Sequence, residues 1–330
     1  MCKKANKACF SIRNGLYSDR INVSPHLKLF DSCVKPIILY CSEIWSLDHI
    51  IRPNSDPESR YISFPPTKVQ LKYAKYLLGV NKRAVNMAVL SELGMMPVAI
   101  DAMKLSFGYW LHLLDCPGSR LVSDVYRFLR ESNTGFTLKI KDLLHKFGFR
   151  HLWDNQSTFS KRRSIFSLSE KIKESYIRYW NNVISSESVG NCGRKLRTYR
   201  KLKNDYTIEN FLYYTDIQKL DISNYIKVRI SNSRLLIEQG RHQNIELNKR
   251  ICPLCKDDVE DEFHFVMMCP KLSHIRDNFF AEIQAAVPSF GNLSQQDKFK
   301  FIMSSNDYDI SKMCILAVSK MYNERLKHVN

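Results

Sequence analysis

Residues 250–270 read RICPLCKDDVEDEFHFVMMCP and place the strongest constraint on what this chain can fold into. Four potential metal ligands follow one another in the order C-x2-C-x8-H-x4-C: Cys252, Cys255, His264 and Cys269. A tight turn through CPLC would direct two thiolates to one point, which the histidine and the third cysteine could reach from the start of a helix. Three cysteines and one histidine form a standard closed ligand set for structural Zn²⁺. The spacing therefore predicts a zinc site.

The predicted zinc has a structural role, because four protein ligands leave no coordination position for a reactive water. A segment of about 20 residues buries too small a core to fold alone, so metal binding would supply its folding free energy. A redox-active CxxC is disfavoured because no βαβ pattern surrounds it. A chance coincidence of the four residues is the alternative. The acidic stretch 256–263, KDDVEDEF, has no role that the sequence assigns.

The charge of the chain favours a polyanionic partner. Its 330 residues carry a formal net charge of +17, although an apolar fraction of 44% is ordinary for a globular protein. Residues 139–203 alone contain 16 Lys or Arg and 5 Asp or Glu. Such a local excess favours binding of nucleic acid. A solvated basic face without a partner is the alternative.

Hydrophobic periodicity predicts a mainly α-helical, multi-helix protein with a small irregular zinc module near the C-terminus. Apolar residues recur at helical spacing in four segments, 69–80, 97–115, 169–184 and 309–329. We interpret the proline-rich segment 51–66 as a loop and residues 185–195 as a hinge. Strand signals are sparse.

Four consecutive regions are expected: a helical region 1–125, a basic helical connector 126–250, the zinc module 251–272 and C-terminal helices 273–330. The sequence shows neither a signal peptide nor a run of about 20 apolar residues that would span a membrane. We therefore expect a cytoplasmic or nuclear protein with no membrane partner, in which thiols stay reduced.

Several motifs, in a fixed order, make the chain similar to a known family. They are LFDSCVKPIILYCSEIW at 29–45, YAKYLLGVNKRAVNMAVLSELGMMPV at 73–98, KLRTYRKLK at 195–203, VRISNSRLLIEQGRHQN at 228–244 and DEFHFVMMCP at 261–270. Over most of residues 20–275 the chain resembles the C-terminal part of the reverse transcriptase of LINE-type (non-LTR) retrotransposons, from the thumb through the zinc-binding domain. Within the second motif, Glu92, Leu93, Gly94 and Pro97 match the family.

The resemblance implies thumb-like helices in region 1–125 that follow a primer–template duplex, and a zinc module that contacts RNA or DNA. It also implies the rest of the reverse transcriptase as a partner. Two positions depart from the family pattern, since Cys41 stands where glycine is usual and Ser233 where histidine is usual.

Polymerase chemistry requires paired aspartates that hold two Mg²⁺ ions. The one adjacent pair in this sequence, Asp257 and Asp258, lies inside the predicted zinc loop and does not follow an aromatic residue in a strand. The sequence also has no segment that resembles the polymerase palm or the endonuclease. We therefore expect no catalytic residue in this chain and no enzyme activity from it alone.

Basic residues are the candidates for nucleic-acid contacts, mainly to phosphates and without sequence-specific readout. They are Lys161, Arg162, Arg163, Arg194, Lys195, Arg197, Arg200, Lys201, Lys203, Arg229, Arg234, Arg241 and Arg250. Tyr199 lies within this series and offers a stacking platform for a base. For Arg229 and Arg234, pairing with Glu238 is the alternative.

Two other functions are compatible with the sequence. A zinc-stabilised protein-interaction module would use the acidic loop 256–263 to bind a basic partner. A remnant of a decayed element would have no selected activity, although the complete set of predicted ligands argues against decay.

Overall fold

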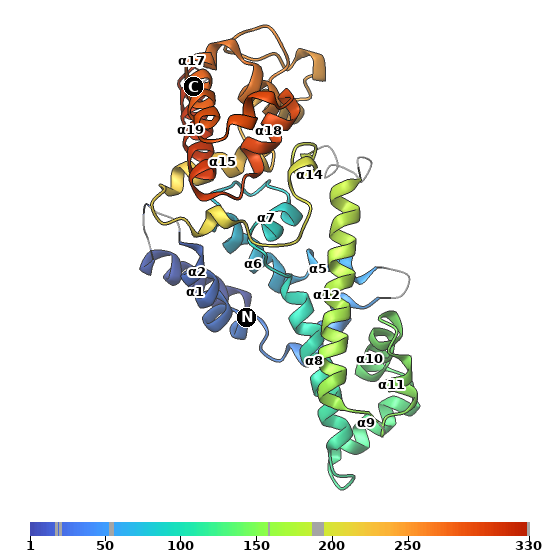
Figure 1. The fold of residues 1–330 in the computed structure, drawn as a ribbon. Helices are drawn as coiled ribbons and strands as arrows, with labels where there is room; N and C mark the ends of the chain where they lie inside the picture. Colours follow the sequence, from blue (N-terminus) through green and yellow to red (C-terminus); the bar gives the residue numbers. More distant parts are fainter. Residues whose placement is uncertain (17–18, 20–21, 53–55, 158, 187–194, 329–330) are drawn as a thin grey trace. The chain divides into compact units, whose positions relative to one another are not determined.

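A computed structural model describes residues 1–16, 19, 22–52, 56–157, 159–186 and 195–328 (Figure 1). Within these residues the protein is mainly helical, and its β pairing is limited to two isolated bridges, Leu93 with Ile208 and Ile251 with Val259. The predicted mainly α fold, with a cluster of three cysteines and one histidine near the C-terminus, is confirmed. No helix in this part of the chain combines the length and the apolar character needed to cross a membrane.

The chain divides into two compact units. Unit 1 comprises Met1–Gly15, Leu27–Lys72 and Met96–Trp180, and unit 2 comprises Leu16–His26, Tyr73–Met95 and Asn181–Asn330. These units differ from the four consecutive regions drawn from the sequence, because Tyr73–Met95 packs with residues from the C-terminal half of the chain. The predicted zinc module is one part of unit 2.

Unit 1 is a helical assembly in which α4 and α8 share the most extensive contact. Its helices are α1 (Cys2–Gly15), η1 (Phe30–Val34), α3 (Lys35–Ile38), α4 (Ser42–Ile50), α5 (Pro57–Tyr61), the first part of α6 (Pro65–Leu77), α8 (Val98–Asp115), α9 (Leu121–Glu131), α10 (Gly135–Lys146), α11 (Arg150–Asp154) and most of α12 (Lys161–Ser185). α8 packs along α4, where Ser46 Oγ lies 3.1 Å from Ser106 Oγ inside the core. Short side chains at this contact allow the two helices to approach closely.

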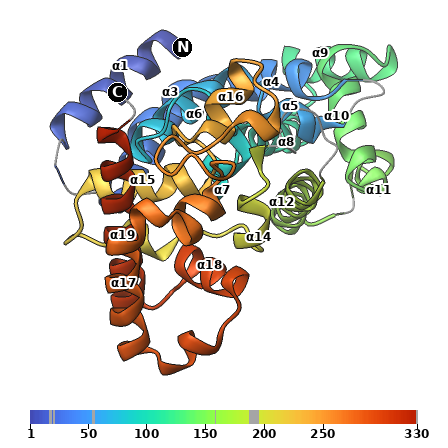
Figure 2. The same cartoon turned by 90° about the horizontal axis from the view of Figure 1, so that it is seen from above.

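Unit 2 holds the cluster of cysteines and histidine. Its helices are the start of α2 (Val23–Leu29), the end of α6, α7 (Asn86–Glu92), α14 (Tyr199–Leu202), η2 (Asn210–Tyr213), α15 (Lys219–Arg229), α16 (Leu236–His242), η3 (Leu247–Lys249), η4 (His264–Met268), η5 (Pro270–Leu272), α17 (Ser273–Ala286), η6 (Pro288–Asn292), α18 (Gln295–Ser304) and α19 (Tyr308–Lys327). α19 packs against α15 and α17 and is the long red helix of Figure 2. Its buried face includes Cys314, Val318 and Met321, so the apolar stripe at 309–329 serves packing.

The four predicted helices correspond to observed ones. The segment 69–80 overlaps α6, which ends at Leu77 and is followed by Gly79 at φ +63°, and 97–115 corresponds to α8. The segment 169–184 is part of the longer α12, and 309–329 corresponds to α19. The prediction of a continuous loop at 51–66 was wrong, because Pro57 and Pro65 open α5 and α6. Proline is favoured at a first helical position, where its missing N–H costs no hydrogen bond. Most of the predicted hinge 185–195 lies outside the described residues.

Gly94 is required by a close backbone approach in unit 2. Its φ is +59°, and a Cβ placed on it would lie 2.9 Å from the backbone nitrogen of Ile208. Where these two segments meet, Leu93 and Ile208 form an isolated β-bridge, and Glu209 N donates to Glu92 O at 3.0 Å. A side chain at this position would therefore push the two segments apart.

We predict that Gly94→Ala lowers the free energy of unfolding by about 1–3 kcal/mol, because alanine is strained at this φ and its Cβ meets backbone atoms. Gly108→Ala is the matched control, since Gly108 lies within α8 and a Cβ there meets no atom within 4 Å. It should be neutral or stabilise the protein by up to about 1 kcal/mol. Urea denaturation of both variants measures the difference, and equal effects would contradict this explanation of Gly94.

Candidate functional site

The four predicted ligands converge in unit 2. Cys252 Sγ lies 3.9 Å from Cys269 Sγ, and Cys255 Sγ lies 3.4 Å from His264 Nε2. All four ligand atoms lie within 4.8 Å of one another. A single metal ion would reach all four, and the arrangement therefore constitutes a candidate metal centre.

The CPLC turn positions the first two ligands. The backbone N–H of Cys252 donates to Asp258 O at 2.7 Å, and that of Lys256 donates to Cys252 O at 2.8 Å. Lys256 adopts a φ of +59°, which lets the chain reverse directly after the second cysteine. The N–H groups of Cys255 and Leu254 also donate to the Cys252 sulfur. Such bonds stabilise a thiolate.

A π-helical turn, η4, positions the other two ligands. The N–H of Cys269 donates to His264 O at 2.8 Å, which is an i→i+5 bond. In an α-helix, residues five apart would point about 140° away from each other, whereas the wider turn brings them towards one side. Asp261 stabilises the start of this segment, because its Oδ1 accepts from His264 N at 2.7 Å. Single π turns of this kind are frequent at functional sites.

The electrostatics of the cluster suit a cation. Burial raises the pKa of Cys252 to about 12 and also raises the pKa of Cys269. These thiols become thiolates at neutral pH only if a positive charge stabilises them, as a bound metal ion does. The buried Nδ1 of His264 has no hydrogen-bond partner, and the Asp258 carboxylate lies 4.0 Å away. A carboxylate beside the second ring nitrogen is a common support for a metal-binding histidine.

Two glutamates of the acidic stretch are buried parts of unit 2. Arg325 of α19 donates to Glu260 through Nε and Nη2, both at 2.8 Å. Arg197 donates to Glu262 through Nε at 3.1 Å and Nη2 at 2.7 Å. Both carboxylates are almost fully buried. The segment between the ligands is thus attached to the rest of unit 2 by two bidentate ion pairs.

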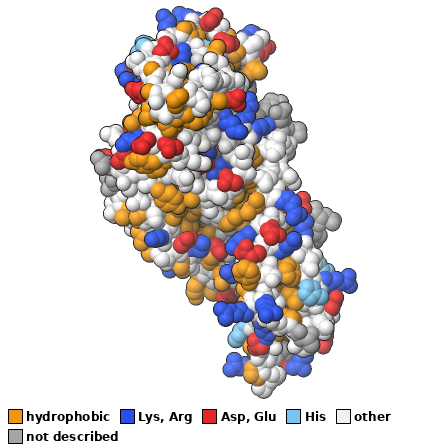
Figure 3. All heavy atoms as spheres, viewed as in Figure 1, with side chains coloured by type: hydrophobic (Ala, Val, Ile, Leu, Met, Phe, Trp, Pro, Cys, Tyr) orange, Lys and Arg blue, Asp and Glu red, His pale blue; other side chains and the backbone are white. Residues whose placement is uncertain are grey.

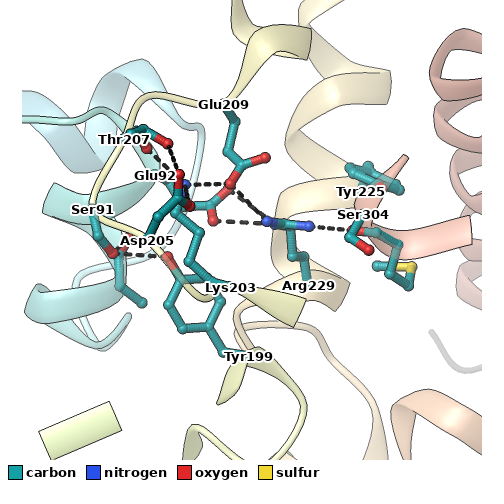
Figure 4. A network of polar contacts seen from close by, with 12 residues as sticks. Ser91, Glu92, Tyr199, Lys203, Asp205, Thr207, Glu209, Tyr225, Arg229 and Ser304 are labelled. Carbon is teal, nitrogen blue, oxygen red and sulfur yellow. Dashed lines mark hydrogen bonds and ion pairs between the residues drawn. The ribbon is translucent and has the colours of Figure 1, made fainter. Parts of the chain in front are cut away.

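Three residues predicted to contact nucleic acid are instead buried in a polar network (Figure 4). Arg229, which is 1% exposed, donates to both Glu92 oxygens at 3.1 and 3.2 Å and to Glu209 at 2.8 Å. Lys203 pairs with the same Glu209. The ring of Tyr199 is 0% exposed, and its hydroxyl lies 2.8 Å from Ser91 Oγ. The prediction of phosphate contacts and of a stacking platform at these positions was wrong, because their partners are inside the protein.

The expected alternative for Arg229 was also wrong, since it does not pair with Glu238. The two partners of Glu238 are Arg197 at 2.8 Å and Arg241 at 3.2 Å. Arg250 donates to the carbonyl groups of Ile245 and Ile237, which holds it against its own backbone.

The remaining predicted cations differ in their surroundings. Lys161 pairs with Asp115, and Arg200 donates to the carbonyl of Ser186 at 3.4 Å. Four of these cations are exposed residues: Arg162, Arg163, Lys201 and Arg234. Arg194 lies outside the described residues. Phosphate binding by the exposed members stays a prediction.

Three cations that were not predicted from the sequence, Lys75, Lys82 and Arg83, lie with the predicted Lys195 around the loop after α6. The carbonyl of Lys82 accepts from Lys75 Nζ at 2.8 Å, and the carbonyl of Arg83 accepts from Lys195 Nζ at 2.7 Å. We call Lys75, Lys82, Arg83 and Lys195 the basic cluster. Burial and the charge of Lys195 lower the pKa of Lys75. The sequence signal was present, because GVNKRAV at 79–85 contains two cations and no acid.

The surplus of positive charge does not by itself mark a binding face. On the face drawn in Figure 3, Lys and Arg side chains are dispersed among acidic and apolar ones. Local surroundings must therefore identify the binding residues. In the basic cluster, the ammonium groups of Lys75 and Lys195 each donate to a main-chain carbonyl, which carries no charge.

The candidate metal centre is a closed set, since four protein atoms can fill a tetrahedral shell. A metal ion held by all four atoms would have no open coordination position for a water. Comparisons with protein-family models, curated proteins and solved structures find no match to this chain.

We predict that the purified chain contains about one metal ion and that Cys255→Ser loses most of it, because three ligands hold a structural ion weakly. The variant should also lower the unfolding temperature of unit 2. Cys33→Ser is the matched control, since Cys33 is exposed and lies outside the cluster. Elemental analysis with calorimetry measures both effects. Full metal content in Cys255→Ser would remove this residue from the ligand set.

We predict that Glu260→Gln lowers the free energy of unfolding by about 3–5 kcal/mol, because it leaves the buried Arg325 without its countercharge. Glu246→Gln is the control. It breaks a surface pair with Lys249, at 2.9 Å, and should cost less than about 1 kcal/mol. Urea denaturation compares the two, and a Glu260→Gln variant as stable as the control would show that the buried pair does not support unit 2.

Proposed function

We propose that this chain is a nucleic-acid-binding C-terminal part of a non-LTR retrotransposon reverse transcriptase, with a structural zinc centre and no catalytic site of its own. The observation that carries the proposal is the basic cluster. It gathers four positive charges around one short loop, and the ammonium groups of Lys75 and Lys195 donate to main-chain carbonyls of that loop. A phosphate backbone is attracted by such a local concentration of positive charge.

The ligand geometry supports zinc as the metal. Zn–S bonds of about 2.3 Å and Zn–N bonds of about 2.0–2.1 Å place tetrahedral ligands about 3.8 Å apart for two sulfurs and about 3.6 Å apart for sulfur and nitrogen. The separations of 3.9 Å and 3.4 Å agree with both values. Three thiolates and Zn²⁺ together carry one negative charge. Arg276, which is buried and donates to Cys269 O at 3.0 Å, offsets it.

In this proposal, zinc and the buried ion pairs keep unit 2 folded, and its outward cations bind RNA or DNA through phosphates. The partners are the nucleic acid and the rest of the reverse transcriptase. Thiol ligands for zinc require a reducing compartment, such as cytoplasm or nucleus.

The alternative, in which the acidic stretch binds a basic protein, has less support. Glu260 and Glu262 are buried and already paired with arginines. Asp257 and Asp258 remain exposed, and two exposed carboxylates make a weak docking site. The motif order, which resembles the reverse transcriptase, adds to the preference for nucleic acid.

We predict that the chain binds a fluorescent single-stranded RNA or DNA oligonucleotide with an affinity that falls steeply as salt rises. Each neutralised phosphate contributes about 0.7 to the slope of log K against log salt for a single strand. Lys82→Gln with Arg83→Gln should reduce that slope by about 1–1.5. Fluorescence anisotropy at a series of salt concentrations measures the slope.

The control variant combines Lys298→Gln with Lys320→Gln, which removes the same charge from α18 and α19. These positions lie outside the basic cluster, so the slope should change little. No binding by the unmodified chain at low salt, or equal slopes for the two double variants, would contradict the proposed function of the cluster.

A further inference from the structure

A pocket in unit 2 lies beside the basic cluster. Its volume is about 430 Å³, and its walls come from the loop at 79–81, from α15 with the segment that follows it, and from the C-terminal part of α19. Its polar lining includes Asn81, Asn224, Lys227, Asn232, Arg234 and Asn323. The described residues that line it include two cations and neither aspartate nor glutamate.

The two cations of this pocket have no carboxylate partner among the residues that the structure describes. The Arg234 side chain makes no hydrogen bond or ion pair with any described residue, and its backbone N–H donates to Tyr322 Oη at 2.9 Å. Lys227 Nζ donates once, to Asn224 Oδ1 at 3.3 Å, so two of its three N–H groups remain for a ligand. Burial and the charge of Arg234 lower the pKa of Lys227. An anion between the two groups would remove that repulsion.

The pocket walls are held by hydrogen bonds that do not use the cations. Asn81 N donates to Asn232 Oδ1 at 2.9 Å, and Asn232 Nδ2 donates back to Asn81 Oδ1 at 3.0 Å. On the opposite wall, Asn224 Nδ2 donates to Asn323 Oδ1 at 3.1 Å. The asparagines thus fix three segments that are far apart in the sequence. A site whose walls are held in advance pays less ordering entropy when it binds.

Gly79 is required at the edge of the pocket. Its φ is +63°, and a Cβ there would lie 2.3 Å from Ser223 Oγ. This serine donates to Gly79 O at 2.9 Å. The contact holds the loop against α15 and places Asn81 next to Asn232, with Lys82 and Arg83 directly following.

We propose that this pocket binds a phosphate group, with Lys227 and Arg234 as its charged ligands. The inference rests on the proposed function and deepens it, because it assigns one phosphate of a bound strand to a defined site. Arginine and lysine are the usual phosphate-binding side chains. The volume exceeds what a lone phosphate needs, which leaves space for the adjoining sugar.

The test uses the full zinc-loaded chain and the double variant Lys227→Gln with Arg234→Gln, compared with the control Lys298→Gln with Lys320→Gln. Two measurements are made on each protein. The first is the slope of log K against log salt for oligonucleotide binding, whose magnitude should fall by about 1–1.5 in the pocket variant only. The second is the rise in unfolding temperature caused by inorganic phosphate, with sodium chloride of equal ionic strength as reference. This rise should be lost in the pocket variant only.

The outcomes separate this inference from the proposed function. If the pocket variant shows both the smaller slope and the loss of stabilisation by phosphate, the pocket binds a phosphate of the strand. If no protein binds the oligonucleotide but phosphate stabilises all except the pocket variant, the pocket binds free phosphate and the proposed function is wrong. If the pocket variant matches the control in both measurements, the pocket assignment is overturned, and steep salt dependence of the unmodified chain would leave the proposed function standing.

Discussion

The structure of unit 2 depends on buried ion pairs between glutamate and arginine. A buried carboxylate without a countercharge is costly, so each one requires an arginine at a defined place. Three such pairs join segments that are far apart in the sequence: Glu92 with Arg229, Glu260 with Arg325, and Glu262 with Arg197. Glu260 and Glu262 lie between the predicted metal ligands, so the metal centre and α19 are connected through these charges. The candidate metal centre is therefore embedded in the unit rather than appended to it.

The same pairs help to explain the positive surface. Carboxylates inside unit 2 neutralise arginines there and cannot reach the outside. Lys75 and Lys195 donate to main-chain carbonyls of the loop at 79–83, and Lys227 of the asparagine-lined pocket donates to an amide oxygen. The acidic side chains of these pairs are therefore unavailable to the cations at the surface of unit 2. We infer that a bound polyanion balances those surface cations, because phosphate is the partner that such surroundings favour.

The sequence predicted four of the helices and the cluster of three cysteines and one histidine because both depend on local patterns. Helices follow from the spacing of apolar residues, and the ligands follow from short distances along the chain around Cys252 and His264. Buried pairing was not predictable in this way, since Arg229 meets Glu92 across 137 residues. Composition likewise could not separate Lys203 and Tyr199, which are buried, from Lys201, which is exposed. Basic residues in one sequence motif can therefore have opposite roles, and only their burial distinguishes a structural cation from a binding one.

We propose that a closed, structural metal centre organises unit 2 while nucleic acid binds elsewhere on it. X-ray absorption at the zinc edge tests this most directly, on the purified chain with and without a bound oligonucleotide. We predict three sulfur ligands at about 2.3 Å and one nitrogen at about 2.0–2.1 Å, unchanged by the oligonucleotide. A spectrum without zinc, a shell with fewer sulfurs and an oxygen ligand, or a ligand change when nucleic acid binds would contradict it.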